Sequence, residues 1–253
     1  MSLRNRDRLI WMGLVVAYVL WWLRYPVSSD LKWKLVSWLL EIAFGVVFSN
    51  ILGRRSLRVF QTALGNEDIP IARRELANLS GFWSRRYQEL IKTYGINILL
   101  LEEHYQDALK ELQALNRGRL PKKAGPIIEN QIAWCQMQLG EPEKGMQIAQ
   151  SALPQLESMG PNYAASGHEV VGVGNLLIGN VSEAVLHLEK AYASSELPAL
   201  RACAAFYLGE AFSALKNTDE AQAAYRRAYE ALPNSKFGAR ASKHLETGLA
   251  NRT

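Results

Sequence analysis

From residue 53 to the C-terminus, a small residue recurs every 36 to 39 positions. The recurring residues are Ala72, Ala108, Gly145, Ala184 and Ala221. Seven positions after each of them comes an apolar residue, and these are Leu79, Leu115, Ala152, Ala191 and Ala228. A period of this length is typical of an α-solenoid, in which one pair of helices cannot bury its apolar face alone and must stack on the next pair. The sequence therefore predicts an all-α fold of about five helical hairpins.

Residues 201–235 show most clearly how one repeat folds. Apolar and small residues at helical spacing predict two amphipathic helices, and these residues are Ala205, Leu208, Phe212, Leu215, Ala221, Ala224, Tyr225 and Ala228. Gly209 and Ala221 carry almost no side chain, so they allow the two helices to approach closely. Pro233 then ends the second helix. Residues 235–250 follow as a predicted capping helix, with an inward face of Phe237, Ala241 and Leu245.

The same stretch resembles the tetratricopeptide repeat (TPR), whose pattern is W-x₂-L-G-x₂-Y…A-x₃-F…P. The residues that carry the resemblance are Ala205, Leu208, Gly209, Phe212, Ala221, Tyr225 and Pro233, and only the leading Trp is replaced. The earlier repeats match well in their second helices, whereas their first helices are degenerate, with Ile96, Ala133 and Gly172 at the position of Gly209. The chain is thus identified as a member of the TPR superfamily, similar to bacterial membrane-anchored TPR proteins.

The N-terminal quarter has a different composition and predicts a transmembrane hairpin. Residues 9–23 contain no charge, and residues 35–52 contain only Glu41. Two helices spanning about 9–25 and 33–52 are long enough to cross the hydrocarbon layer with their flanking residues. A signal peptide is the alternative for the first segment, but no small-residue cleavage site follows it. The predicted domains are therefore the hairpin at 1–53, a linker and degenerate first repeat at 54–88, TPR-like repeats at 89–234, and the capping helix and tail at 235–253.

Small and polar residues form a stripe on each predicted membrane helix. Gly13 and Ala17 make such a pair on the first helix, and the stripe on the second consists of Ser37, Glu41, Gly45 and Ser49. Stripes of this kind let helix backbones pack closely in lipid. Glu41 is costly at membrane depth unless it faces protein or water, so we expect it to bond to the first helix or to a second subunit. An ion relay is the alternative, but no second intramembrane carboxylate or histidine accompanies it.

The positive charge of the chain is concentrated in the same N-terminal quarter. Residues 1–60 hold nine Lys/Arg against three Asp/Glu, whereas the remainder is close to neutral. A near-neutral solenoid argues against nucleic-acid binding, which needs clustered positive charge on the folded surface. Arginines precede the first predicted span and follow the second, so the positive-inside rule places both termini in the cytoplasm. We expect an integral protein of a bacterial inner membrane, with the lipid bilayer as one partner.

No residue pattern in the chain predicts catalysis, a cofactor or a metal. None of the four histidines forms an i, i+4 pair or an HExxH motif. Gly172 and Gly174 do not follow a strand, so we interpret them as sites of close helix packing rather than a phosphate loop. Cys135 and Cys203 lie on predicted helix faces of different repeats and are expected to be buried and free of a disulfide. The expected protein is not an enzyme.

The resemblance to TPR proteins also implies where a partner binds. In that family the first helix of each pair lines a concave groove, and the matching positions here are Leu90, Thr93, Asn97, Leu101, Ile127, Asn130, Trp134, Met137, Ser166, Glu169, Val173, Leu177, Cys203, Phe206, Glu210 and Ser213. The expected partner-binding residues are Asn97, Asn130, Trp134, Val173, Leu177, Phe206 and Glu210. Trp134, Met137 and Leu177 could instead form the core between repeats. The groove positions include no Lys or Arg, which argues against the family's binding of acidic C-terminal tails.

The expected function is that of a membrane-anchored scaffold or adaptor, which binds protein partners at the cytoplasmic face of the membrane. A second copy of the chain, in a homo-oligomer, is a further candidate partner. The alternative is a non-catalytic subunit or assembly factor of an integral-membrane enzyme or transport complex, which would work through its hairpin. The sequence identifies neither the partner nor the pathway.

Overall fold

The computed structural model describes residues 53–82 and 88–250, which belong to a compact unit spanning Gly53–Thr253. The predicted membrane spans, with Gly13, Ala17, Ser37, Glu41, Gly45 and Ser49, lie outside the described residues. Within the described part of the chain, no helix combines the length and apolarity that a membrane crossing requires.

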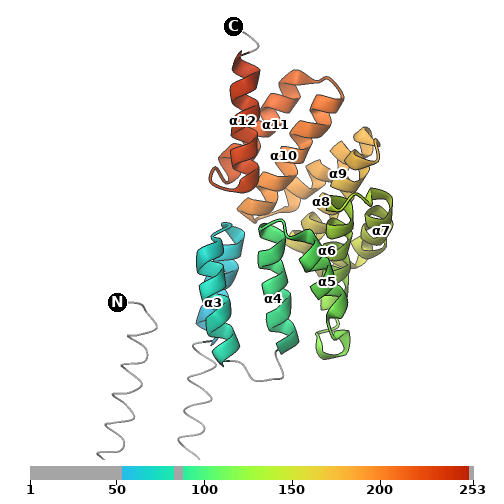
Figure 1. Cartoon of the computed structure of the whole chain (residues 1–253). Coiled ribbons are helices and arrows are strands. Elements are labelled where there is room, and N and C mark those ends of the chain that lie inside the picture. Colours follow the sequence, from blue (N-terminus) through green and yellow to red (C-terminus); the bar gives the residue numbers. More distant parts are fainter. Residues whose placement is uncertain (1–52, 83–87, 251–253) are drawn as a thin grey trace, which may run out of the picture. The chain divides into compact units, whose positions relative to one another are not determined.

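The described residues form an α-solenoid of helical hairpins, as the sequence predicts (Figure 1). A first helix at residues 53–65 is followed by α3 (Ile69–Phe82), α4 (Gln88–Leu101), α5 (Tyr105–Ala114), α6 (Ala124–Gln138), α7 (Pro142–Met159), α8 (Pro161–Leu177), α9 (Val181–Ser194), α10 (Pro198–Ala214), α11 (Thr218–Ala231) and α12 (Lys236–Ala250). A short 3₁₀ helix, η2 (Arg117–Arg119), lies between α5 and α6. Helices 53–65/α3, α4/α5, α6/α7, α8/α9 and α10/α11 make five hairpins, and α12 packs on α10 and α11.

All five hairpins turn in the same way. One residue of each turn has a left-handed backbone, and these residues are Glu67, Glu103, Gly140, Gly179 and Lys216. The next residue donates its backbone N–H to the carbonyl five positions earlier, at 2.8–2.9 Å, in every repeat. This is the Schellman arrangement, which satisfies carbonyl groups at the end of the first helix. A left-handed backbone costs about 1–2 kcal/mol for a residue other than glycine, and three of the five turns carry such a residue: Glu67, Glu103 and Lys216.

The recurring small residues occupy equivalent places in the five hairpins. Each is the fourth residue of its second helix, and all ten residues of the predicted pattern are buried. At Gly145 an added Cβ would lie 2.6 Å from the carbonyl oxygen of Ala133 on the partner helix. At Gly209 it would lie 2.4 Å from the ring of Tyr225. The predicted close approach of the paired helices is therefore confirmed.

Helix α12 caps the last hairpin and also reaches the first two. Phe237 and Ala241 are buried against α10 and α11, as predicted. At the start of α12, the carboxylate of Glu67 accepts the backbone N–H of Lys236 at 2.9 Å. One turn later, Arg240 donates to the carboxylate of Glu103 at 2.8 Å. We call these contacts the α12 clasp. The turns of the first two hairpins thus present the side chains of Glu67 and Glu103 to α12.

Candidate functional site

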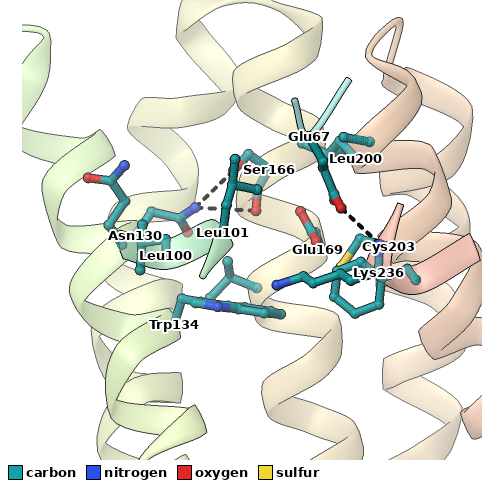
Figure 2. Close-up of a pocket in the computed structure, with 14 residues that line it drawn as sticks. Glu67, Leu100, Leu101, Asn130, Trp134, Ser166, Glu169, Leu200, Cys203 and Lys236 are labelled. Carbon is teal, nitrogen blue, oxygen red and sulfur yellow. Dashed lines mark hydrogen bonds between the residues drawn. The ribbon is translucent and has the colours of Figure 1, made fainter. Parts of the chain in front are cut away.

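A cavity of about 230 Å³ lies where the first helices of the hairpins meet α12 (Figure 2). It is lined by Glu67, Leu100, Leu101, Asn130, Gln131, Trp134, Ser166, Glu169, Val170, Ala199, Leu200, Cys203, Lys236 and Phe237. Residues from positions 67 to 237 thus come together at one place. A cavity of this size has room for one or two side chains of a ligand, with the remainder of the ligand outside.

The cavity crosses the row of first helices diagonally. It touches α4 at its last residue, Leu101, and α6 in its middle, at Asn130 and Trp134. It touches α8 and α10 nearer their N-termini, at Ser166 and Cys203. Successive hairpins therefore contribute progressively earlier positions to one site.

Asn130 carries an acceptor that nothing in the described chain satisfies. Its side chain is only 5% exposed. Its Nδ2 donates to the Oγ and to the carbonyl oxygen of Ser166, at 3.1 and 3.3 Å. Its Oδ1 is the one buried side-chain nitrogen or oxygen without a hydrogen-bond partner among the residues described. An unpaired buried acceptor costs about 1–3 kcal/mol, so a donor from a ligand would be favoured here.

Glu169 places a carboxyl group in the same cavity. Burial raises its pKa to about 7, and the thiol of Cys203 and the charge of Lys236 offset that rise only in part. No Lys, Arg or His lies within ion-pair distance of Glu169 in the described part of the chain. The same burial raises the pKa of the Cys203 thiol, which keeps the thiol protonated. Cys135 and Cys203 are both buried and free, as predicted.

Lys236 adds a positive charge to the cavity, although the expected groove positions include no Lys or Arg. Its Nζ lies 3.6 Å from Oε1 of Glu103 and 4.8 Å from the centre of the Phe237 ring. Figure 2 shows its side chain extending across the cavity toward Trp134. Trp134 is half-buried and makes an edge contact with Tyr207, with the ring centroids 6.1 Å apart. The site thus combines one aromatic wall, one ammonium, two carboxylates and one unpaired amide oxygen.

The seven expected partner-binding residues do not all lie at this site. Asn130 and Trp134 line the cavity. Asn97 lies just behind it, where its Oδ1 accepts from Gln131 at 2.6 Å. Val173 and Phe206 are buried in the core, with 0% and 7% of their surface exposed, so a partner could not reach most of either side chain.

Leu177 and Glu210 lie elsewhere on the solenoid. Leu177 is exposed at the end of α8, and Glu210 accepts a hydrogen bond from the hydroxyl of Tyr225 on α11. Met137, for which a core position was the alternative, is buried. Of the seven expected partner-binding residues, only Asn130 and Trp134 therefore line the cavity.

Two features of the cavity were missed because they come from outside the first helices. Glu67 is in the turn before α3, and Lys236 opens the capping helix. A signal for Glu67 exists in the sequence, since a charged residue stands there at the turn position that holds glycine in two other repeats. No local pattern marks Lys236.

A second, larger hollow of about 540 Å³ lies among α3, α4 and α5. Two of its charged residues are already paired, Arg73 with Glu102 and Lys92 with Glu89. None of its lining residues has a buried polar side-chain atom without a partner. In the described ranges there is also no cluster of three or more His, Cys, Asp or Glu that could hold a metal ion. The smaller cavity is therefore the candidate site.

A histidine pair lies apart from the cavity, between α8 and α9. Nδ1 of His168 is 3.0 Å from Nδ1 of His187, and Nε2 of His168 is 3.2 Å from Glu157 of α7. If Nε2 of His168 donates to Glu157, then Nδ1 of His168 must accept from His187. A proton added to Nδ1 of His168 would therefore place two N–H groups against each other. Burial lowers the pKa of both histidines, and for His168 the charge of His187 lowers it further.

We expect this pair to make the solenoid less stable in mild acid. Because both folded-state pKa values are lowered, the unfolded chain binds more protons below about pH 6.5, and stability falls as pH drops through that range. Glu169 acts in the opposite sense, since its raised pKa favours the folded state as pH falls. His187→Gln should therefore reduce the loss of urea midpoint between pH 7.5 and 5.5, measured on the full-length chain in detergent. His104→Gln, at an exposed histidine, is the control. An unchanged pH dependence in His187→Gln would contradict this account.

The comparisons with known proteins support the fold. No protein-family model matches the chain, and no curated protein sequence matches it either. Among solved structures, the chain is similar to PlcR of Bacillus thuringiensis, solved in complex with the peptide PapR7 and DNA, with a TM-score of 0.59 and 16% identity over 88% of this chain and 76% of that one. YrrB, described as a TPR protein with an unusual peptide-binding site, aligns with a TM-score of 0.42 and 14% identity, over 79% of this chain and 90% of that one. MamA aligns with a TM-score of 0.38 and 15% identity, over 62% and 94% respectively.

Proposed function

Because the chain is a TPR-like α-solenoid with a cavity bounded by its first helices and capping helix, we propose that it is a peptide-binding scaffold. In this proposal an extended segment of a partner protein inserts one or two side chains into the cavity. The observation that carries the proposal is the unpaired Oδ1 of Asn130, which is buried at the cavity wall and lacks a donor. A backbone or side-chain N–H of a bound peptide would supply one. The peptide bound in the structure of PlcR, whose fold is similar, is consistent with this use of the solenoid.

The apolar part of the lining suits the same ligand. Leu100, Leu101 and Leu200 surround the polar groups, and Trp134 offers a rigid aromatic surface. Peptide sites commonly gain affinity from a few buried aromatic or aliphatic contacts and gain orientation from a few polar ones. The cavity has both kinds of group within one small volume.

Filling the cavity should abolish peptide binding. Ala199 lines the cavity at the start of α10, so Ala199→Trp would occupy the space that the ligand needs. Ala214 is exposed near the end of the same helix, and Ala214→Trp is the matched control. Short peptides selected from a random display library on the full-length protein in detergent should bind the wild type and Ala214→Trp equally, and Ala199→Trp at least about 100-fold more weakly.

Leu101→Trp is a second variant that fills the cavity, from a different hairpin. It keeps the test informative if Ala199→Trp does not fold. Fluorescence anisotropy gives the affinities, and urea unfolding checks that each variant is folded. If no peptide is selected, or if folded filling variants bind as well as the wild type, the cavity is not a peptide site.

We further propose that residues 1–53 anchor this scaffold in a bacterial inner membrane, with the solenoid on the cytoplasmic side. The support is the apolar character of 9–25 and 33–52 and the arginines at both ends of the predicted hairpin. Partner proteins would then be recruited at the membrane surface.

Cysteine accessibility in intact cells tests this topology. In a background with Cys135 and Cys203 replaced by alanine, Ser29→Cys should react with a membrane-impermeant thiol reagent, because it lies in the predicted external loop. Ser158→Cys, on the exposed surface of α7, should react only after lysis. The opposite pattern would place the solenoid outside the cytoplasm.

A further inference from the structure

We infer that the cavity selects a peptide with a positively charged side chain, lysine or arginine, whose cationic group binds between Oδ1 of Asn130 and the carboxylate of Glu169. This inference rests on the proposed peptide-binding function and specifies its ligand. The two groups come from α6 and α8 and line the same cavity (Figure 2). Both are acceptors, and a protonated amine or guanidinium offers donors without competing acceptors.

The charges of the lining favour a cation. Glu67 and Glu169 contribute two negative charges when ionised, and Lys236 contributes one positive charge. Glu67 accepts the backbone N–H of Lys236 in the α12 clasp, whereas Glu169 has no ion-pair partner among the described residues. The carboxylate of Glu169, when ionised, therefore has no direct counter-ion among the described residues, and a cationic side chain of a ligand would supply one. The half-buried indole of Trp134 adds a surface that attracts cations.

The positive charge of Lys236 would instead favour an anionic ligand. Its ammonium is already engaged, because Nζ lies 3.6 Å from Glu103 and 4.8 Å from the centre of the Phe237 ring. An anion bound to it would also lie near Glu169 and could not donate to Oδ1 of Asn130. The two ligands make opposite predictions for Lys236→Met. Removing this charge should strengthen the binding of a cation and weaken the binding of an anion.

The test uses peptides selected on the wild-type full-length chain, after Ala199→Trp has established that they bind in the cavity. We expect a lysine or arginine at one fixed position of the selected peptides. Replacing it with norleucine, which keeps the apolar length and removes the charge, should weaken binding about tenfold or more. Glu169→Gln should weaken the binding of the charged peptide by a similar factor and leave the affinity for the norleucine peptide nearly unchanged. Glu230→Gln, at an exposed position on α11, is the control.

The pH dependence gives an independent readout. The pKa of Glu169 is raised to about 7 by burial, with smaller influences from Cys203 on α10, Lys236 on α12 and Glu67 before α3. Its ionised fraction therefore rises from about 10% to about 90% between pH 6 and pH 8. Affinity for the charged peptide should rise up to about ninefold over this range in the wild type and stay level in Glu169→Gln.

These experiments distinguish a cavity that does not select cations from a cavity that does not bind peptides at all. Peptides that bind in the cavity without a basic residue, and whose affinity Glu169→Gln does not change, would overturn the inference and leave the scaffold function standing. Weaker binding in Lys236→Met would overturn it in favour of an anionic ligand. The absence of any peptide that Ala199→Trp excludes would remove the proposed function and the inference together.

Discussion

Replacing Ala221 with glutamate is expected to destabilise the solenoid by about 3–5 kcal/mol, through overpacking and the burial of a charge. Ala221 is 3% exposed and lies in the cluster formed by α10, α11 and α12. It is the fourth residue of α11, the position that holds a small residue in all five hairpins. A longer side chain there would force α10 and α11 apart.

Because a solenoid is stabilised through neighbouring repeats, the loss should appear first at the C-terminal end. Hydrogen exchange should rise in α10, α11 and α12 before it rises in α4 and α5. Ala223→Glu is the matched control, since Ala223 is exposed on the same helix and should change stability by only about 0.5 kcal/mol. Equal increases of exchange in residues 89–115 would contradict the repeat-by-repeat account.

Gly238→Ala is expected to cost about 2–3 kcal/mol and to loosen the α12 clasp. A Cβ at this position would lie 2.1 Å from the carbonyl oxygen of Leu232 and 2.9 Å from that of Pro233. Both contacts are with backbone, which cannot rotate away as a side chain can. The first turn of α12 would have to move, and with it Lys236 and Phe237, which line the cavity.

The same substitution at Gly125 should have the opposite sign. Gly125 is the second residue of α6, and an added Cβ there meets no atom within 4 Å. Alanine in a helix is favoured over glycine, so Gly125→Ala should stabilise the chain by about 0.5–1 kcal/mol. Urea unfolding of the two variants measures the difference, and hydrogen exchange at residues 236–247 shows whether α12 has detached. A Gly238→Ala variant as stable as the wild type would mean that α12 packs less tightly than the structure has it.

The repeat pattern could be predicted from the sequence because it depends on local requirements that recur. A small residue near the start of each second helix and an apolar residue seven positions later are enough to place five hairpins. The capping helix could be predicted for the same reason, since Phe237 and Ala241 lie at helical spacing on one face. The left-handed turn residues were harder to predict. Glycine marks them in only two hairpins, at Gly140 and Gly179, whereas the other three have Glu67, Glu103 and Lys216.

The site could be predicted only in part, because the packing of the hairpins against one another and against α12 determines which residues line the cavity. The TPR resemblance places groove residues at equivalent positions of every first helix, so it predicts the same role for Trp134 and Val173. The structure separates the two residues, since the cavity is lined by Trp134 on α6 but reaches no farther along α8 than Val170. The contribution of α12 depends on contacts between positions 67 and 236, which no local pattern records.

If a peptide binds against Trp134 in the cavity, the fluorine NMR spectrum of protein labelled with 5-fluorotryptophan should report the contact. The Trp134 resonance is assigned as the signal missing from Trp134→Phe, which separates it from the six other tryptophans of the chain. On titration with a selected peptide, this resonance should shift and saturate at one equivalent, with the affinity found by anisotropy. A peptide that binds with full affinity while the Trp134 resonance stays unchanged would show that the ligand occupies another surface, and would contradict the account.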